Sequence, residues 1–439
     1  MTSDTRPAFD ADHPPSQELL DDCVHCGFCL PTCPTYVLWG EEMDSPRGRI
    51  HLMDQAANGE PMSASMVGHI DACLSCMACV TACPSGVQYD KLVGATRSQV
   101  ERRFERPRAQ RLLREAIFAV FPYPRRLHAL RLPLKAYQRS GAQKLVRRSG
   151  LLERLSPTLA MMEAVAPPVL TDVRLPRLVP ARGPRRRAVV GLLTGCVQRE
   201  FFPGVNAATA RVLSAEGCDV VVPQTQGCCG ALSAHNGRRA EAQGFARRLV
   251  DAFEDAGVEH VVVNAAGCGS TMKEYAELLE DDPAYADRAA AFGAKVRDVT
   301  ELLVELGPVA ERHRVDVTVA YHDACHLAHA QGVRTPPRDL LRAVPGVQVR
   351  EIAEGSICCG SAGVYNLINP GPARELGDRK AANVAATKAQ LLVTANPGCL
   401  LQVTDALRRS GTSIATAHTV EVLDASIRAV GAAHLLDRA

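Results

Sequence analysis

Two cysteine runs near the N-terminus constrain this chain more than any other feature of its sequence. Each run has the form C-x-x-C-x-x-C-x-x-x-C-P, the first over residues 23–34 and the second over residues 73–84. Three thiolates at this spacing are typical ligands of one cubane iron–sulfur cluster, and the fourth cysteine of such a run binds the other cluster. The two runs therefore predict a ferredoxin domain with two 4Fe–4S clusters.

This exchange of fourth cysteines assigns eight ligands. Cluster 1 takes Cys23, Cys26, Cys29 and Cys83, and cluster 2 takes Cys73, Cys76, Cys79 and Cys33. Zinc is the alternative metal for C-x-x-C pairs. A zinc site uses two pairs of ligands, however, and not three evenly spaced cysteines with a distant fourth before proline. The spacing favours the clusters.

The 39 residues between Cys33 and Cys73 exceed what a compact two-cluster ferredoxin needs. Apolar residues at helical spacing after Ser45-Pro46 predict one or two inserted helices, and hence a mainly helical domain. Arg47 and Arg49 lie at the start of this segment. They either offset the negative charge of the clusters or face solvent, and we expect them to face solvent.

Eight of the remaining nine cysteines form an internal repeat. The first copy holds Cys196, Cys228, Cys229 and Cys268, and the second holds Cys325, Cys358, Cys359 and Cys399. From the first cysteine to the CCG motif and then to the last cysteine, the gaps are 32 and 40 positions in one copy and 33 and 41 in the other. Only Cys218 fits no pattern, and we expect it to be a buried core thiol.

Both copies carry the signals of parallel α/β units. Short β-branched runs predict buried strands at 188–193, 261–263, 317–320 and 391–394. Helical spacing of apolar residues follows at 206–215 and 238–254. Because sites in such sheets form at the carboxyl ends of strands, we expect Cys196, Cys268, Cys325 and Cys399 to lie there.

These signals predict an α+β multidomain chain. Its parts are a helical ferredoxin domain over 18–100, a basic helical linker over 101–186, and CCG α/β repeats over 187–311 and 312–439. From residue 101 to residue 187 there are 21 Lys and Arg against 6 Asp and Glu. Basic amphipathic helices in this linker either lie on an anionic membrane or pack against the domains or an acidic partner subunit. Packing is the favoured interpretation.

Composition and missing motifs exclude several function classes. No apolar stretch reaches 18 residues, so we expect no membrane-spanning helix. No signal peptide precedes the first run either. The 17 cysteines therefore indicate metal ligands in a reducing compartment, the cytoplasm, and not disulfides. Nucleic-acid binding is not expected, because the net charge is +2, aromatic residues make up 4% and no reader motif occurs. A G-x-G-x-x-G dinucleotide fingerprint is also absent, so we expect any flavin to be on another chain.

Several motifs resemble one family, the iron–sulfur subunit of bacterial glycolate oxidase. They are His25-Cys26-Gly27-Phe28-Cys29, Cys33-Pro34-Thr35-Tyr36, the segment 44–50, the segment 206–213, Gly227-Cys228-Cys229-Gly230 and Cys358-Cys359-Gly360-Ser361-Ala362-Gly363. The resemblance implies a complex in which flavin subunits oxidise glycolate to glyoxylate. This subunit would pass electrons toward a quinone or membrane acceptor, at the inner face of the membrane, and have no catalytic residues of its own.

The same layout also resembles other complexes, which leaves alternatives open. These are the equivalent subunit of an L-lactate or glycerol-3-phosphate dehydrogenase, a heterodisulfide-reductase-like enzyme, and a scaffold whose metals only hold the fold. In the heterodisulfide reductase pattern a further cysteine follows the last one of each repeat. Here Thr271 and Gln402 occupy those positions, which argues against five-thiolate clusters.

Four thiolates in each CCG repeat are enough for a 4Fe–4S cluster or a zinc ion. A vestigial site without metal is the alternative. His322 and His326 flank Cys325 and could tune or bind a metal there. We expect supporting or core roles for both histidines.

Overall fold

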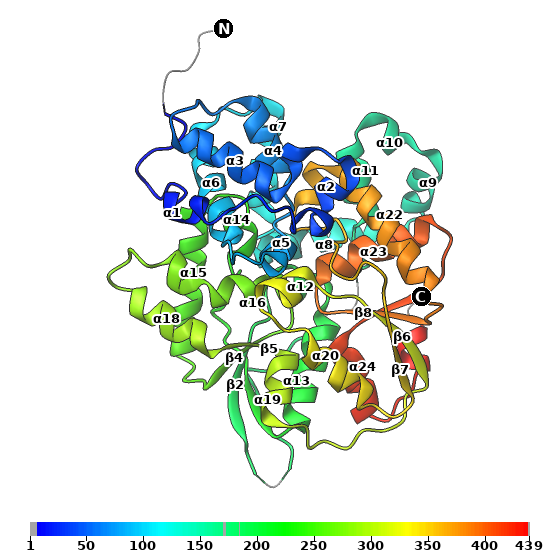
Figure 1. Cartoon of the computed structure of the whole chain (residues 1–439). Helices are drawn as coiled ribbons and strands as arrows, with labels where there is room; N and C mark the ends of the chain where they lie inside the picture. The colour runs from blue at the N-terminus through cyan, green and yellow to red at the C-terminus, as the bar shows by residue number, and fades with distance from the viewer. Residues whose placement is uncertain (1–6, 170–172, 184, 438–439) are drawn as a thin grey trace.

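A computed structural model describes residues 7–169, 173–183 and 185–437. The N-terminal domain lies on one side of two α/β units, and the strands of both units are at the opposite end of the molecule (Figure 1). The predicted class, a helical ferredoxin-type domain followed by two α/β repeats, is confirmed.

The N-terminal domain is helical and holds both cysteine runs. Its elements are α1 (Gln17–Asp21), η1 (Leu30–Thr32), α2 (Pro34–Trp39), η2 (Glu42–Asp44), α3 (Pro46–Ala57), α4 (Ala64–Ala72), α5 (Ala78–Ala82) and α6 (Tyr89–Arg103). Three of these, α2, α3 and α4, lie between the runs, so the inserted helices are confirmed. Ser45 caps α3 by accepting a hydrogen bond from the Gly48 amide at 3.0 Å, and Pro46 takes the first helical position.

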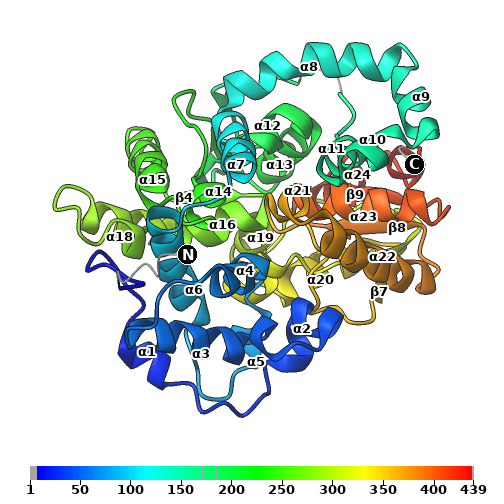
Figure 2. The ribbon, with the colours of Figure 1, turned by 90° about the horizontal axis from the view of Figure 1, so that it is seen from above.

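The linker is helical over most of its length. It forms α7 (Arg108–Val120), α8 (Pro124–Arg139), α9 (Ala142–Ser149), α10 (Leu151–Leu155) and α11 (Pro157–Ala164). Seen from above, α8 and α9 follow the outer rim of the molecule, and α10 turns back inward toward α11 (Figure 2). The chain then forms a short strand, β1 (Leu178–Val179), which pairs antiparallel with the first repeat. The end of the predicted linker is therefore part of a sheet. This strand has only two residues, which is too short to be recognised in the sequence.

The first repeat is a five-stranded sheet in the order β1-β3-β2-β4-β5, parallel except for β1. Its elements are β2 (Ala188–Leu192), α12 (Val197–Phe201), α13 (Pro203–Ala215), β3 (Cys218–Val221), α14 (Ala231–Ala234), α15 (Arg239–Glu254), β4 (His260–Val263), α16 (Ala266–Lys273), α17 (Tyr275–Leu278), α18 (Ala286–Lys295), β5 (Val296–Asp298) and α19 (Val299–Leu306).

The second repeat is a four-stranded parallel sheet in the order β7-β6-β8-β9. Its elements are β6 (Val317–Tyr321), the π-helical turn η3 (His326–Ala330), α20 (Thr335–Arg342), β7 (Val347–Glu351), α21 (Tyr365–Ile368), α22 (Pro370–Ala386), β8 (Leu391–Thr394), α23 (Pro397–Arg409), β9 (Ala415–His418), α24 (Thr419–Ile427) and α25 (Ala433–Leu436). The four predicted strands correspond to β2, β4, β6 and β8 and are confirmed.

The two repeats share one hydrophobic core. Residues of β2, α13 and α19 from the first repeat join residues of β6, β8 and α24 from the second in a single apolar cluster. Across this interface Arg211 makes two hydrogen bonds of 2.7 Å to the carboxylate of Asp424. His418 Nε2 lies 2.8 Å from the carbonyl oxygen of Asn264. Cys218 belongs to this core with 0% exposure, as predicted.

The N-terminal domain contacts the second repeat through its second cysteine run and the first repeat through the following helix, α6. His326 Nε2 lies 2.7 Å from the carbonyl oxygen of Ser75, and Thr81 Oγ1 lies 2.7 Å from His329 Nδ1. Arg97 on α6 donates a hydrogen bond to the carbonyl oxygen of His235 in the first repeat at 2.7 Å. The second run is therefore enclosed between the three units.

Candidate metal centres

The first group of thiols lies in one cavity of the N-terminal domain. Cys23, Cys26 and Cys29 line it together with Cys83, which comes from the second run. Burial raises the pKa of the Cys23 thiol, and the charges of Cys83 and Cys26 raise it further. Cys26 is exposed, so this group reaches the protein surface. The structure thus brings together the four residues predicted for cluster 1.

The second group is buried. Burial raises the pKa of the Cys79 thiol well above its usual value, and its charged neighbours include Cys76, Cys73 and Cys33. Cys33 comes from the first run and is 6% exposed, and it is close enough to Cys76 and Cys79 for its charge to raise the pKa of both. The residues predicted for cluster 2 therefore also lie together. The assignment of ligands to each cluster stays a prediction.

The loops around these thiols fit cubane clusters. His25, Ser75 and Met77 have positive φ values of 53°, 49° and 61°, so both runs fold back on themselves next to their cysteines. A cubane spreads its four ligands over different irons. Accordingly, among the described residues no three of the eight sulfurs lie within 4.8 Å of one another.

Arg49 is the buried cation beside the second group. The residue is 1% exposed, forms an ion pair with Asp44 at 3.2 Å, and donates a hydrogen bond to the carbonyl oxygen of His69 at 2.6 Å. Its Nη1 lies 3.9 Å from the sulfur of Cys33. The expectation that Arg49 faces solvent is therefore wrong. Its carboxylate partner Asp44 and the carbonyl oxygen of His69 make burial possible, and the fold brings His69 to it from 20 residues away in sequence.

Arg49 also affects a second thiol. Burial by itself raises the pKa of Cys73, but Arg49 and Arg97 outweigh it and lower that pKa below its usual value. Two hydrogen bonds to the sulfur act in the same direction, from the Ser75 amide at 3.4 Å and the Tyr89 hydroxyl at 3.6 Å. Arg47 differs from Arg49, because it is partly exposed and binds Glu42 and the carbonyl oxygen of His25.

The four cysteines of the first repeat gather at the carboxyl ends of its strands. Cys196 follows β2, Cys228 and Cys229 follow β3, and Cys268 lies in α16 after β4. The sulfurs of Cys196 and Cys228 are 3.7 Å apart. Leu127 of α8 belongs to the same apolar cluster as these two cysteines. The linker therefore covers this site.

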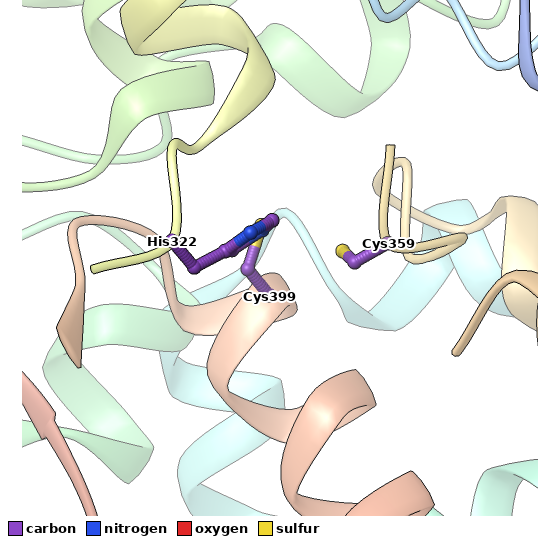
Figure 3. A group of neighbouring side chains, drawn as sticks. All are labelled: His322, Cys359 and Cys399. Carbon is purple, nitrogen blue, oxygen red and sulfur yellow. The ribbon is translucent and has the colours of Figure 1, made fainter. Parts of the chain in front are cut away.

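The second repeat places its cysteines in the same way, and adds a histidine. Cys325 follows β6, Cys358 and Cys359 follow β7, and Cys399 lies in α23 after β8. A nitrogen of His322 and the sulfurs of Cys359 and Cys399 all lie within 4.8 Å of one another (Figure 3). The neighbouring thiols Cys358 and Cys399 hold the pKa of Cys359 well below its ordinary value.

The second repeat's site adjoins the buried group of the N-terminal domain. Burial raises the pKa of Cys76 well above its usual value, and the charge of Cys325 adds to this rise. Cys76 and Cys358 also belong to one apolar cluster. The first repeat's cysteines belong to other clusters. The two repeats are thus unlike in their surroundings, which their similar sequences do not reveal.

Two cations at these sites, Arg97 partly buried and Lys380 buried, were not predicted from the sequence. Arg97 of α6 donates a hydrogen bond to the carbonyl oxygen of Cys73 at 2.5 Å. Lys380 of α22 is 2% exposed, donates to the carbonyl oxygen of Glu354 at 2.7 Å, and is close enough to Cys359 for the thiolate to act on its pKa. Neither residue stands in a recognisable motif, because helix packing alone brings it to the cysteines.

The linker has one buried and one exposed apolar face. Ile117 and Phe118 of α7 are buried, and Arg114 forms an ion pair with Glu101 at 3.0 Å, as internal packing predicts. The exposed leucines of α7 to α11 are Leu112, Leu130, Leu132, Leu145, Leu151, Leu155 and Leu159. Within the described part of the chain, no helix is both long and apolar enough to cross a membrane.

Three family models match the chain and divide it as the fold does. A 4Fe-4S dicluster domain matches residues 19–87, and a cysteine-rich domain matches residues 190–273 and 319–404. Between them, residues 109–166 match the linker region of the glycolate oxidase iron-sulfur subunit. Iron–sulfur clusters are therefore the cofactor class of this protein.

Curated relatives agree with these matches. The chain is 40% identical over 427 residues to the probable glycolate oxidase iron-sulfur subunit of Bacillus subtilis, covering 94% of each chain. It is 36% identical to the glycolate oxidase iron-sulfur subunit of Escherichia coli, over 94% of this chain and 95% of that one. Lactate utilization protein A of Exiguobacterium sp. is 29% identical, over 54% of this chain and 98% of that one. The chain belongs to the family of the glycolate oxidase iron–sulfur subunit.

Proposed function

We propose that this chain is the electron-transfer subunit of a complex that oxidises glycolate to glyoxylate. The observation that carries the proposal is the pair of thiol groups, one reaching the surface at Cys26 and one enclosed between three units, in a chain of this family. A surface site and a buried site in one domain suit a relay. Flavin subunits would deliver electrons to it, and a quinone-type acceptor would receive them.

The proposal assigns two 4Fe–4S clusters, which supply one-electron transfer when bound, to the eight thiols of the ferredoxin domain. Cys23, Cys26, Cys29 and Cys83 would hold cluster 1, and Cys73, Cys76, Cys79 and Cys33 would hold cluster 2. Arg49 and Arg97 would stabilise the added negative charge of a reduced cluster 2, because both are close to its predicted ligands. The division into 18–100, 101–186, 187–311 and 312–439 is part of this proposal.

Further metal at the CCG repeats also belongs to the proposal. Cys196, Cys228, Cys229 and Cys268 form one possible site, and Cys325, Cys358, Cys359 and Cys399 form the other. Both sets gather at the carboxyl ends of parallel strands, and thiolates at such positions suit an iron–sulfur cluster or zinc.

The partners would be flavin-containing subunits of the same complex, with no role for nucleic acid. We place the complex in the cytoplasm, peripheral on the inner face of the membrane. Exposed leucines on α8, α9 and α10 next to Arg147 and Arg148 support such a contact surface. Binding to anionic vesicles that high salt reverses would support this placement, and no binding at low salt would contradict it.

Reconstitution of the complex tests the function. The chain alone should accept electrons from a reductant but not oxidise glycolate, and glycolate-dependent quinone reduction should appear only with the flavin subunits. Cys26→Ser or Cys76→Ser should abolish most of this activity, since each removes a predicted ligand. Cys218→Ser is the matched control, because Cys218 is a buried cysteine outside every site.

Substrate preference separates the remaining candidates. The lactate utilization relative supports a second candidate, a subunit serving L-lactate oxidation, although it matches only about half of the chain. If the reconstituted complex oxidises lactate or glycerol-3-phosphate and not glycolate, the relay role survives and the substrate is wrong. Disulfide reduction by the chain alone would overturn the relay role itself.

A further inference from the structure

His322 is a buried histidine whose ring lies beside the thiols of Cys359 and Cys399. It follows β6, its side chain is enclosed with 2% exposure of the residue, and its backbone amide is fixed by Val393 at 2.8 Å. Neither ring nitrogen has a partner among the described residues. Leaving a buried polar group unpaired costs about 1–3 kcal/mol, so such a group calls for a ligand. Figure 3 shows the ring extending toward the space between Cys399 and Cys359.

The spacing of these three donors suits a single ion. A zinc ion bonds sulfur at about 2.3 Å and imidazole nitrogen at about 2.0–2.1 Å, which puts the corners of a tetrahedral site about 3.5–3.8 Å apart. A nitrogen of His322 and the sulfurs of Cys359 and Cys399 all lie within 4.8 Å of one another. Across the described residues, no three cysteines of the ferredoxin domain or of the first repeat come this close.

The first repeat has no equivalent histidine. His322 lies three residues before the first cysteine of its repeat, and the residue three before Cys196 is Leu193. Leu193 is 2% exposed and packs in an apolar cluster of the first repeat. The two repeats therefore differ in donor chemistry, with four thiols in one site and four thiols and an imidazole in the other.

We propose that the second repeat binds one Zn²⁺ through His322, Cys359 and Cys399, with Cys325 or Cys358 as the fourth ligand. Two thiols and an imidazole from three different segments thus meet at one point, as the ligands of a zinc ion do. The ion would join the ends of β6 and β8 to the CCG loop. Since zinc has no redox chemistry, this centre fixes structure beside Cys76 and stores no electron.

Metal analysis of the full-length protein tests the proposal. After dialysis against a chelator, wild type should keep one zinc per chain in addition to its iron. His322→Leu should lose that zinc under the same treatment, because its remaining thiols must rearrange to supply the missing ligand, while its iron content is unchanged. Leucine is the matched replacement, because the first repeat already packs a leucine at this position. His326→Gln is the control, since its Nε2 lies 2.7 Å from the carbonyl oxygen of Ser75 and is committed there. It should keep the zinc.

A second variant guards against misfolding. His322→Cys supplies a thiolate in place of the imidazole and should restore one zinc per chain. With Co²⁺ in place of zinc, the visible ligand-field bands should shift between wild type and His322→Cys, because a nitrogen donor has become sulfur. Wild type without zinc, undiminished zinc in His322→Leu, or identical Co²⁺ spectra in wild type and His322→Cys would each overturn the proposal.

Discussion

Removal of the Arg49 charge should lower the reduction potential of the buried cluster. The guanidinium lies 3.9 Å from the sulfur of Cys33, one of the four thiols predicted to hold cluster 2. A cation beside a cluster stabilises the reduced form, which carries one more negative charge. Arg49→Met removes that cation without removing the stem that fills the buried space.

The size of the effect follows from the distance. At an effective dielectric constant of about 20, unit charges 3.9 Å apart interact by about 4 kcal/mol. The added electron is shared over the whole cluster, so about half of this, or about 2 kcal/mol, acts on reduction. One tenfold change in equilibrium equals about 1.4 kcal/mol and 59 mV for one electron. We therefore expect a decrease of about 90 mV.

Redox titration followed by electron paramagnetic resonance measures this shift. Asp44→Asn is the matched variant, because it removes the opposite charge from the same ion pair and should raise the potential. Arg49→Met alone also leaves the Asp44 carboxylate buried, at a cost of about 3–5 kcal/mol in folding. The double variant avoids that cost and should have a potential between those of the single variants. Equal potentials in wild type and Arg49→Met would refute the reasoning.

Three further predictions concern the ferredoxin domain and the repeat interface. Cys83→Ser should damage the cluster of Cys23, Cys26 and Cys29, and spectra showing loss confined to the other cluster would contradict the exchange of fourth cysteines. Gly48→Ala places its Cβ 2.0 Å from the carbonyl oxygen of Glu42 and should lower the melting temperature of the protein. The Cβ of Gly68→Ala meets nothing within 4 Å, so this variant should not lower the melting temperature. Equal melting temperatures of the two variants would show that the close approach at Gly48 is unimportant. Burial lowers the pKa of His418 from 6.5 to about 4. As the pH falls, this histidine is therefore protonated in the unfolded chain before it is protonated in the folded one. Between pH 8 and pH 5 the free energy of unfolding of wild type should decrease by about 2 kcal/mol more than that of His418→Gln. Urea unfolding followed by circular dichroism measures this difference. Comparison with the variant removes the contribution of all other titrating groups, and an equal decrease in both proteins would contradict the prediction.

The cysteine spacing and the strand periodicity were enough to predict the fold class. Both are local signals, because ligand spacing is fixed by cluster geometry and buried parallel strands are short and β-branched. The grouping of Cys83 with Cys23 followed from the same spacing. In contrast, β1 left no signal, because a two-residue antiparallel edge pairing depends only on where the linker happens to pass β3.

The surroundings of the sites depend on packing between units, which spacing cannot predict. Arg49 was expected in solvent because charged residues are usually exposed, but Asp44, Thr35 and the carbonyl oxygen of His69 together make its burial possible. The difference between the repeats is of the same kind. Only the fold shows that Cys325 faces Cys76 while α8 covers Cys196.

The position of Cys83 in the cavity of Cys23 has a consequence for how this protein is made. Residues 23–29 leave the ribosome well before residue 83, so the first cavity remains open on one side for some 50 residues of synthesis. Closing it brings together two segments that are far apart in sequence. Iron delivery and folding of the domain are therefore coupled, and a chain truncated before residue 83 should not retain the cluster of Cys23, Cys26 and Cys29.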